Sequence, residues 1–273
     1  LLWFAKDVVL DPLQRHASLG YILVSILIIE GWFFSSQLGL ANTDSMSILK
    51  VALGAIIVLV LLALRRVNME AVNELMEDKG IDDIYISRPP LTNLAVFCVI
   101  AFTAVEFLYP TNTALGWLGL AAAASILATT SDYILKDKFI LNLGFVIYLA
   151  LIPIMISAGY AFMGWDILNE DISGINHFRH FITSGGLGLA YIVIMMIVGW
   201  IHTGRHLTVN IYTNLMILLI VVATLMRSLI PFFDNYIHEL YMLSSIIWAI
   251  PFVLYIKVFF GFLLEPRADG IKG

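Results

Sequence analysis

The chain has 273 residues, of which 60% are hydrophobic and 13% are charged, and its mean hydropathy is +0.93. This composition excludes a water-soluble domain with one buried core, since such domains carry roughly a quarter of charged residues. The net charge of −5 and the scattered basic residues give no support for nucleic-acid binding, and the single cysteine, Cys98, excludes an internal disulfide.

Apolar runs long enough to cross a bilayer recur along the whole sequence and predict an all-α fold. In chain order they are residues 17–39, 47–65, 91–109, 114–135, 139–164, 178–201, 208–230 and 238–264. Apart from residues 66–90, the connections are short, and no repeat or boundary divides the chain. We therefore expect one domain, residues 1–273, built as a polytopic transmembrane helix bundle of about eight spans.

The basic residues fall almost entirely on one side of these spans. That side includes both termini and every second loop, whereas the opposite loops are acidic, with Arg179 as the basic exception. Because cytoplasmic loops carry an excess of Lys and Arg, both termini are predicted to be cytoplasmic. This alternation also supports the number of spans.

The long connection, residues 66–90, is predicted to be a cytoplasmic amphipathic segment. Val72, Leu75 and Met76 share one face of a helix there, and its acidic residues lie on other faces. Such an acidic helix is a poor match for anionic lipid. We expect it to be solvated or to face a partner protein, and the solvated alternative is the simpler one.

Several ionisable residues lie within the predicted spans, among them Glu30, Glu106 and Arg227. Ionisable groups in a membrane are expensive and are therefore functional candidates. Glu30 lies deepest, and a function and a structural pairing are equally open for it. Glu106 and Arg227 lie near the outer face, where we expect Glu106 to reach water and Arg227 to extend toward the interface.

The six histidines lie at the ends of the spans, and the sixth span has them at both ends. Imidazole is a common ligand of haem iron and of copper, and a pair three or four residues apart projects from one helical face. Two metal sites follow as hypotheses. The outer one uses His180, with His177 or His238, and the inner one uses His202 or His206, with His16. The alternative is that these are ordinary interfacial histidines.

Small residues follow His180 in "TSGGLGLA". Gly185, Gly186 and Gly188 remove side-chain bulk over about one turn, where either a flat macrocycle or a neighbouring helix can lie. At the inner end, Arg205 is a candidate partner for a haem propionate. Gly204 is placed to end its helix in a left-handed turn, which leaves His206 outside the helix.

Three stretches of the second half resemble the NnrS family of bacterial membrane proteins. "RHFITSGGLGLAYIVIM" is similar to the family segment His-Ala-Leu-Thr-Val-Gly-x-x-Gly, and "GWIHTGRHL" to Leu-Gly-His-Thr-Gly-Arg-Pro-Leu. "FFGFLLEPRADGIKG" is similar to the C-terminal ending Pro-Arg-x-Asp-Gly-x-x-Gly. The resemblance rests on residues 139–273, and its matching positions include His180, Gly185, Gly188, His202 and Arg205.

This resemblance implies a multi-pass protein of the bacterial inner membrane that binds b-type haem, with copper as a second cofactor, and that is linked to nitric oxide, nitrosative stress or respiratory metabolism. It implies that His180 and His202 are the ligands. Family members are longer, so we expect residues before Leu1.

The chain departs from the family pattern at several positions. Asn142 stands where a family histidine is expected, Ile197 stands near an expected arginine, and the early Trp-His-x-His-Glu motif is absent. These departures favour an alternative in which the chain is a cofactor-poor structural or accessory subunit of a membrane redox complex. A transporter is disfavoured, because no paired broken helices lie near the middle of the membrane.

Overall fold

The computed structural model describes residues 17–135, 138–169 and 175–270, which are mostly helical. Eight helices in this part of the chain are long and apolar enough to cross a membrane, which confirms the predicted architecture. They are α2 (Ala17–Gln37), α3 (Ser45–Asp78), α4 (Pro89–Leu108), α5 (Ala114–Ala128) with the 3-10 turn η1 (Thr129–Tyr133), α6 (Phe145–Leu168), the composite span Ile175–His202, α9 (Ile211–Ser228) and α10 (Ile237–Leu264).

The composite span and the connections contain shorter elements. The span consists of α7 (Ile175–His180), the π-helical turn η3 (Phe181–Leu187) and α8 (Gly188–His202). Between the fourth and fifth spans, β1 (Ile134–Leu135) pairs antiparallel with β2 (Lys138–Phe139), and the 3-10 turn η2 (Ile140–Leu143) follows. Two further 3-10 turns, η4 (Ile230–Phe232) and η5 (Asp234–Tyr236), join α9 to α10.

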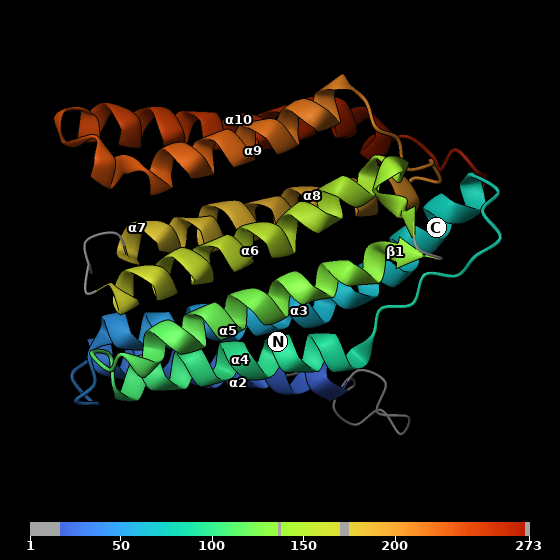
Figure 1. Cartoon of the computed structure of the whole chain (residues 1–273). Coiled ribbons are helices and arrows are strands. Elements are labelled where there is room, and N and C mark those ends of the chain that lie inside the picture. Colours follow the sequence, from blue (N-terminus) through green and yellow to red (C-terminus); the bar gives the residue numbers. More distant parts are fainter. Residues whose placement is uncertain (1–16, 136–137, 170–174, 271–273) are drawn as a thin grey trace.

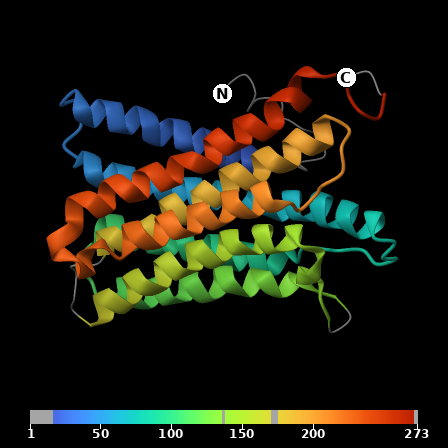
Figure 2. The same cartoon turned by 90° about the horizontal axis from the view of Figure 1, so that it is seen from above.

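The helices run side by side in three tiers (Figure 1). Helices α2 to α5 form one tier, α6 lies beside α7 and α8 in the middle, and the α9–α10 hairpin forms the third (Figures 1 and 2). In the most apolar segment of α6, 67% of the residues are buried, whereas the corresponding shares are 6% in α2 and 17% in α10. Helix α6 is therefore the centre of the core, whereas α2 and α10 present apolar side chains outward, as contact with a lipid bilayer requires.

Small residues allow α5 and α6 to pack closely. A Cβ added to Gly119 would lie 3.0 Å from the Cα of Gly164. A Cβ added to Gly116 would lie 2.7 Å from the side chain of Leu168 and 3.0 Å from the carbonyl oxygen of Gly164. Small residues are the usual means by which membrane helices approach one another, because apolar side chains gain little from leaving lipid.

Local sequence determines where several helices begin. The Asp44 carboxylate accepts a hydrogen bond from the Ser47 N–H at 2.9 Å and caps α3. This bond stabilises the ionised carboxylate and lowers the pKa of Asp44. Asn210 caps α9 together with Thr213 in a capping box. Helix α6 begins later than predicted, because Gly144 has a φ of +63°, which interrupts the helix before Phe145.

The second span corrects the expectation for residues 66–90. Helix α3 continues beyond the apolar run to Asp78. Val72, Leu75 and Met76 are buried (0%, 5% and 1% exposed) within the core of the chain itself, so their face is covered by the protein and is neither solvated nor free for a partner. The sequence pattern showed the apolar face correctly, but the covering surface comes from distant segments.

An irregular segment returns from α3 to α4 and is fixed to α3 and to η1. The Asn73 side chain accepts a hydrogen bond from the Tyr85 N–H at 2.7 Å and donates one to the Tyr85 carbonyl at 3.1 Å. The Tyr85 ring stacks on Tyr133, and its burial raises the pKa of its hydroxyl. The buried Asp132 carboxylate accepts hydrogen bonds from the Arg88 N–H at 3.0 Å and from Arg88 Nε at 2.6 Å.

The start of α2 and the end of α10 lie at the same end of the bundle, on the right in Figure 1. An even number of spans requires this arrangement. We call it the inner end, because it is the end predicted to be cytoplasmic. The opposite end, where α7 begins, is the outer end.

Candidate functional site

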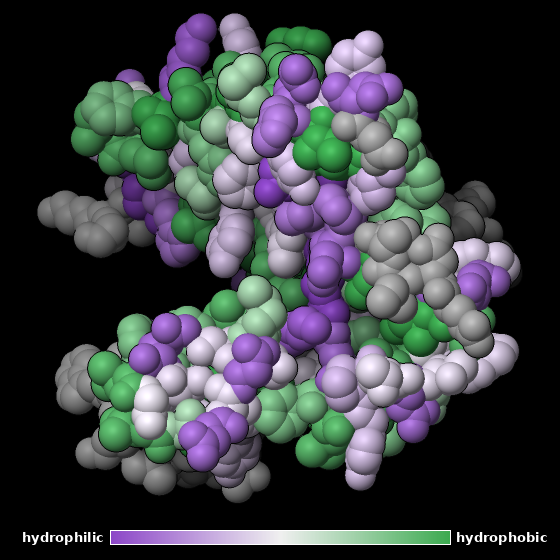
Figure 3. Space-filling view, turned by 90° about the vertical axis from the view of Figure 1, so that its left-hand side faces the viewer, coloured by the Kyte–Doolittle hydropathy of each residue, from purple (hydrophilic) through white to green (hydrophobic). Residues whose placement is uncertain are grey.

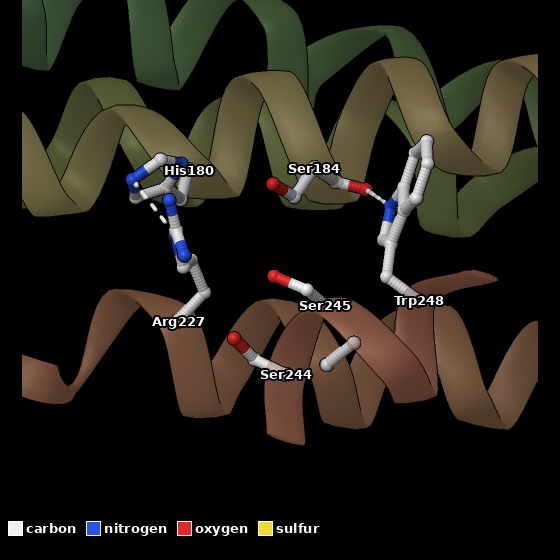
Figure 4. A pocket seen from close by; sticks show the side chains of 7 residues that line it. His180, Ser184, Arg227, Ser244, Ser245 and Trp248 are labelled. Carbon is white, nitrogen blue, oxygen red and sulfur yellow. Dashed lines mark hydrogen bonds between the residues drawn. The ribbon is translucent and has the colours of Figure 1, made fainter. Parts of the chain in front are cut away.

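A pocket of 220 Å³ lies near the outer end, between η3, α9 and α10 (Figure 4). His180 and Arg227 lie on one side of it and Trp248 on the other, with serine side chains between them (Figure 4). The lining residues are His180, Ser184, Ala223, Arg227, Ser244, Ser245 and Trp248. The structure thus places His180, the first predicted ligand, in a pocket that is otherwise polar on one side and aromatic on the other.

His180 contacts Arg227, a residue that was not predicted to belong to this site. The Nε of Arg227 donates a hydrogen bond to the Nε2 of His180 over 3.4 Å. The Arg227 guanidinium also lies over the ring of Tyr241, 4.2 Å from the centroid. We expected Arg227 to extend toward the interface, and it does lie in the last turn of α9, close to the outer end, but its half-buried side chain is turned toward the pocket. Its position four residues before Pro231 gave no signal of this contact.

His177 lies one helical turn before His180, and the two ring centroids are 6.4 Å apart. His177 also faces the ring of Tyr241, at a centroid distance of 6.4 Å. The Nδ1 of His177 is buried and has no hydrogen-bond partner within the described part of the chain. The predicted outer pair is therefore brought together, with one nitrogen unsatisfied.

A π-helical turn shapes the chain directly after His180. The N–H of Gly188 donates to the carbonyls of Thr183 and Gly185, and the carbonyl of Ser184 accepts a hydrogen bond from Trp248 Nε1 at 3.0 Å. Single π-turns are rare and occur frequently at functional sites. Here the turn couples the helix that carries His180 to α10.

The glycines of this turn are covered by neighbouring side chains. A Cβ added to Gly185 would lie 2.9 Å from Thr224, and one added to Gly188 would lie 2.9 Å from Trp248. Gly186 faces Ile156 in the same manner, at 2.3 Å. Of the two alternatives left open for "TSGGLGLA", the neighbouring helix fills this space in the structure.

These observations bear on which cofactor the outer site can hold. Two imidazoles, one with an unsatisfied nitrogen, fit a single copper ion, for which imidazole is a suitable ligand. A haem fits poorly, because the pocket of 220 Å³ is smaller than the roughly 300–1,000 Å³ of ordinary ligand pockets. Haem ligation by His180 would require α10 to move away from η3.

The inner histidines lie far from this pocket, at the other end of the span. His202 is exposed in the last turn of α8. The side chain of His206 is 80% exposed, and its Nδ1 is 3.1 Å from the Asp78 carboxylate. His238 is exposed at the start of α10, and His16 lies outside the described residues. Among the residues that the structure describes, no three His, Cys, Asp or Glu side chains are grouped to hold a metal ion.

The two family-like motifs at the inner end contact each other. As predicted, Gly204 ends α8 with a φ of +68°, and the Arg205 N–H donates to the Trp200 carbonyl at 2.9 Å. The Ala268 N–H donates to the Thr203 carbonyl at 2.9 Å. Arg267 pairs with Asp269 and also donates to the His202 carbonyl at 3.3 Å.

Arg205 has a local role in this arrangement. Its Nη2 is 2.8 Å from the Glu265 carboxylate, and its guanidinium lies 4.4 Å from the Phe262 ring centroid. The partner predicted for Arg205, a haem propionate, stays a prediction. In the structure, the positive charge of Arg205 is already paired with the carboxylate of Glu265, directly after α10.

Glu106 is a residue for which the expectation was wrong. It is only 7% exposed, and its carboxylate accepts two hydrogen bonds from the Arg179 guanidinium. Nη1 donates to Oε2 at 3.3 Å, and Nη2 donates to Oε1. The Nζ of Lys50 is 3.7 Å from Glu106 Oε1. A hollow of 520 Å³ adjoins this cluster at the outer end face, where Figure 3 shows hydrophilic residues gathered in a recess. Glu30, by contrast, is exposed on α2.

Comparison with known proteins gives a family for the chain. A family model described as "NnrS protein" matches residues 1–267, so the match includes the first half, in which few family motifs were recognisable. No curated protein and no solved structure matches the chain. Because the family model matches nearly the whole sequence, the chain, a multi-pass membrane protein by its eight apolar helices, belongs to the NnrS family.

Proposed function

We propose that this protein binds a metal cofactor at the outer pair, His177 and His180, and that it acts in nitric oxide or respiratory metabolism in the bacterial inner membrane. The observation that carries the proposal is the buried, unpartnered Nδ1 of His177 beside His180. A buried polar atom without a partner costs free energy, and a metal bond would offset that cost. The link to nitric oxide rests on the family resemblance.

Copper is the cofactor that we propose first, and b-type haem is the second. The size of the pocket and the covered glycines support this order. When bound, copper supplies one-electron chemistry. The protein's own residues would hold it through the two imidazoles, while Arg227 orients the His180 ring and Trp248 closes the pocket toward η3.

Metal analysis together with an optical spectrum of the purified protein tests this proposal. We expect stoichiometric copper that is lost in His180→Ala and strongly reduced in His177→Ala, because each substitution removes one of two ligands. His238→Ala is the matched control, since His238 is exposed on α10 outside the pocket, and it should retain the metal.

Other outcomes of the same experiment discriminate between the cofactors. A Soret band that disappears in His180→Ala would replace copper by haem as the cofactor. Metal that is retained in both His177→Ala and His180→Ala would place the cofactor elsewhere in the chain and would contradict the proposal.

A second candidate function is that of a structural or accessory subunit of a membrane redox complex. The outward faces of α2 and α10, whose apolar segments are only 6% and 17% buried, favour it, because they offer surface for neighbouring subunits. Colourless, metal-free and well-folded protein that co-purifies with stoichiometric partners in a mild detergent would support this function. Well-folded protein that purifies alone with its metal would contradict it.

A further inference from the structure

Arg227 lacks the carboxylate partner that four other arginines have in the described part of the chain. Arg88, Arg179, Arg205 and Arg267 each pair with a carboxylate. Arg227 contacts His180 and the Tyr241 ring, and none of the carboxylates in the described ranges lies within ion-pair distance of it. A positive charge among membrane-spanning helices is expensive, and such charges are almost always paired. Arg227 is therefore a candidate to bind an anion that does not belong to the described residues.

The pocket beside Arg227 offers hydrogen-bonding groups for such an anion. Ser184 projects from η3 and Ser245 from α10 into the space between Arg227 and Trp248 (Figure 4). Ser244 lines the same pocket, and the hydroxyls of Ser244 and Ser245 donate hydrogen bonds to the Tyr241 carbonyl at 3.0 and 2.8 Å, so each donates to an anion only after rotating away from that carbonyl. A guanidinium with neighbouring hydroxyls is a typical environment for a phosphate group, which accepts two parallel hydrogen bonds from arginine.

We propose that this pocket binds a phosphate group, either inorganic phosphate or the headgroup phosphate of a phospholipid. The size agrees, because 220 Å³ holds a phosphate with a few waters but is too small for a large ligand. The position of Arg227 along α9 agrees with both inorganic phosphate and a phospholipid headgroup, because Arg227 is in the last turn of this helix, which ends at Ser228. The Arg227 side chain therefore lies close to the outer end, at the level of lipid headgroups.

This inference goes beyond the proposed metal site and does not require it. His180 lines the pocket, but the charge that binds the phosphate is that of Arg227. If a metal is bound at His177 and His180, a phosphate on Arg227 would offset the two positive charges brought close together. If no metal is bound, the phosphate still satisfies Arg227.

The test uses full-length purified protein, delipidated in a non-ionic detergent, with its metal content measured before and after chelator treatment. Inorganic phosphate in one arm and short-chain phosphatidylglycerol in the other are titrated at constant ionic strength, and binding is measured by calorimetry. We expect Arg227→Gln to weaken binding about tenfold or more, because it removes a charge-assisted hydrogen bond. Lys257→Gln, which removes one charge from an exposed position of α10, should bind as the unchanged protein does.

The two arms identify the source of the phosphate. Binding of inorganic phosphate indicates a free anion, whereas binding of phosphatidylglycerol alone indicates a lipid headgroup. Ser245→Ala, at an exposed position that does not disturb the core, should weaken binding severalfold and provides a readout if Arg227→Gln misfolds. Binding that is equal in Arg227→Gln, Ser245→Ala and Lys257→Gln, or undetectable in both arms, overturns the proposal. Binding that depends on Arg227 in metal-free protein supports it even if the copper proposal fails.

Discussion

Glu106 illustrates how this protein accommodates charge within its spans. The carboxylate comes from α4, the two cations come from α3 and α7, and the group of Lys50, Glu106 and Arg179 ties three helices together at the outer end. Arg179 was the basic exception in the charge pattern, and its pairing with Glu106 explains that exception. Because Arg179 lies between His177 and His180 in α7, this ion pair also holds the helix that carries the outer histidines.

Replacing Glu106 is expected to destabilise the fold. Glu106→Gln leaves the Arg179 guanidinium, whose side chain is only 13% exposed, without its counter-charge, and breaking such a pair costs about 3 kcal/mol. Thermal unfolding in detergent should show a clearly lower melting temperature. Glu239→Gln, at an exposed position of α10, is the control and should melt as the unchanged protein does. Equal melting temperatures for the two variants would mean that the ion pair contributes nothing to stability.

At the scale of the elements, the end of α8 shows what the family-like motifs do. The Thr-Gly-Arg turn ends the helix, and the segment after α10 packs onto it through Ala268, Arg267 and Asp269. Gly204 is required there twice, because its φ is +68° and because a Cβ would lie 2.6 Å from the Asp269 carboxylate carbon. The two motifs thus form one structural unit at the inner end.

Gly204→Ala should detach the C-terminal segment without unfolding the bundle. A left-handed alanine costs roughly 1–2 kcal/mol, and the contact with Asp269 must shift to make room. Hydrogen exchange of residues 265–270 should become faster, while exchange in α6 stays slow. Gly261→Ala is the matched control, since no atom lies within 4 Å of a Cβ added there. Unchanged exchange in Gly204→Ala would show that the turn does not hold the segment.

At the scale of the whole molecule, the arrangement of eight spans separates two chemically different ends. The outer end has the histidine pair, Arg227 and the group of Lys50, Glu106 and Arg179, whereas the inner end has the paired strands β1 and β2, the end of α3 and the segment after α10 (Figure 1). The positive charges at the inner end predict that this end faces the cytoplasm. The metal and phosphate sites proposed above would therefore face the outside of the cell membrane.

Cysteine labelling in intact cells of a bacterial expression host tests this orientation. In a Cys98→Ala background, Asn42→Cys in the α2–α3 loop should react with a membrane-impermeant maleimide in intact cells. Asp82→Cys, in the α3–α4 connection, should react only after lysis. Both positions are exposed, so the membrane alone distinguishes them. The opposite pattern would invert the topology and move the histidine pair to the cytoplasmic side.

Some of the candidate site could be predicted from the sequence and some could not. The spacing of His177 and His180 places them on one helical face, which is a local property of a helix. Arg227 is 47 residues from His180, and its turn toward the pocket depends on how α9 packs against η3, which no local pattern reports. The same reason explains Glu106, whose partner Arg179 is 73 residues away.

The sequence by itself determined the number of spans, their order and their charge asymmetry, because a helix in lipid must satisfy its own backbone and an apolar run of sufficient length shows this directly. It also determined the left-handed end of α8, since only glycine adopts that backbone conformation at little cost. Only the tertiary structure decided which charges lie together and what covers the glycines after His180. It also decided which surface covers the apolar face of residues 66–78, the part of α3 beyond the predicted span. Apolar helices gain little specificity from lipid exclusion, so their partners are chosen by shape and by a few polar contacts between distant residues.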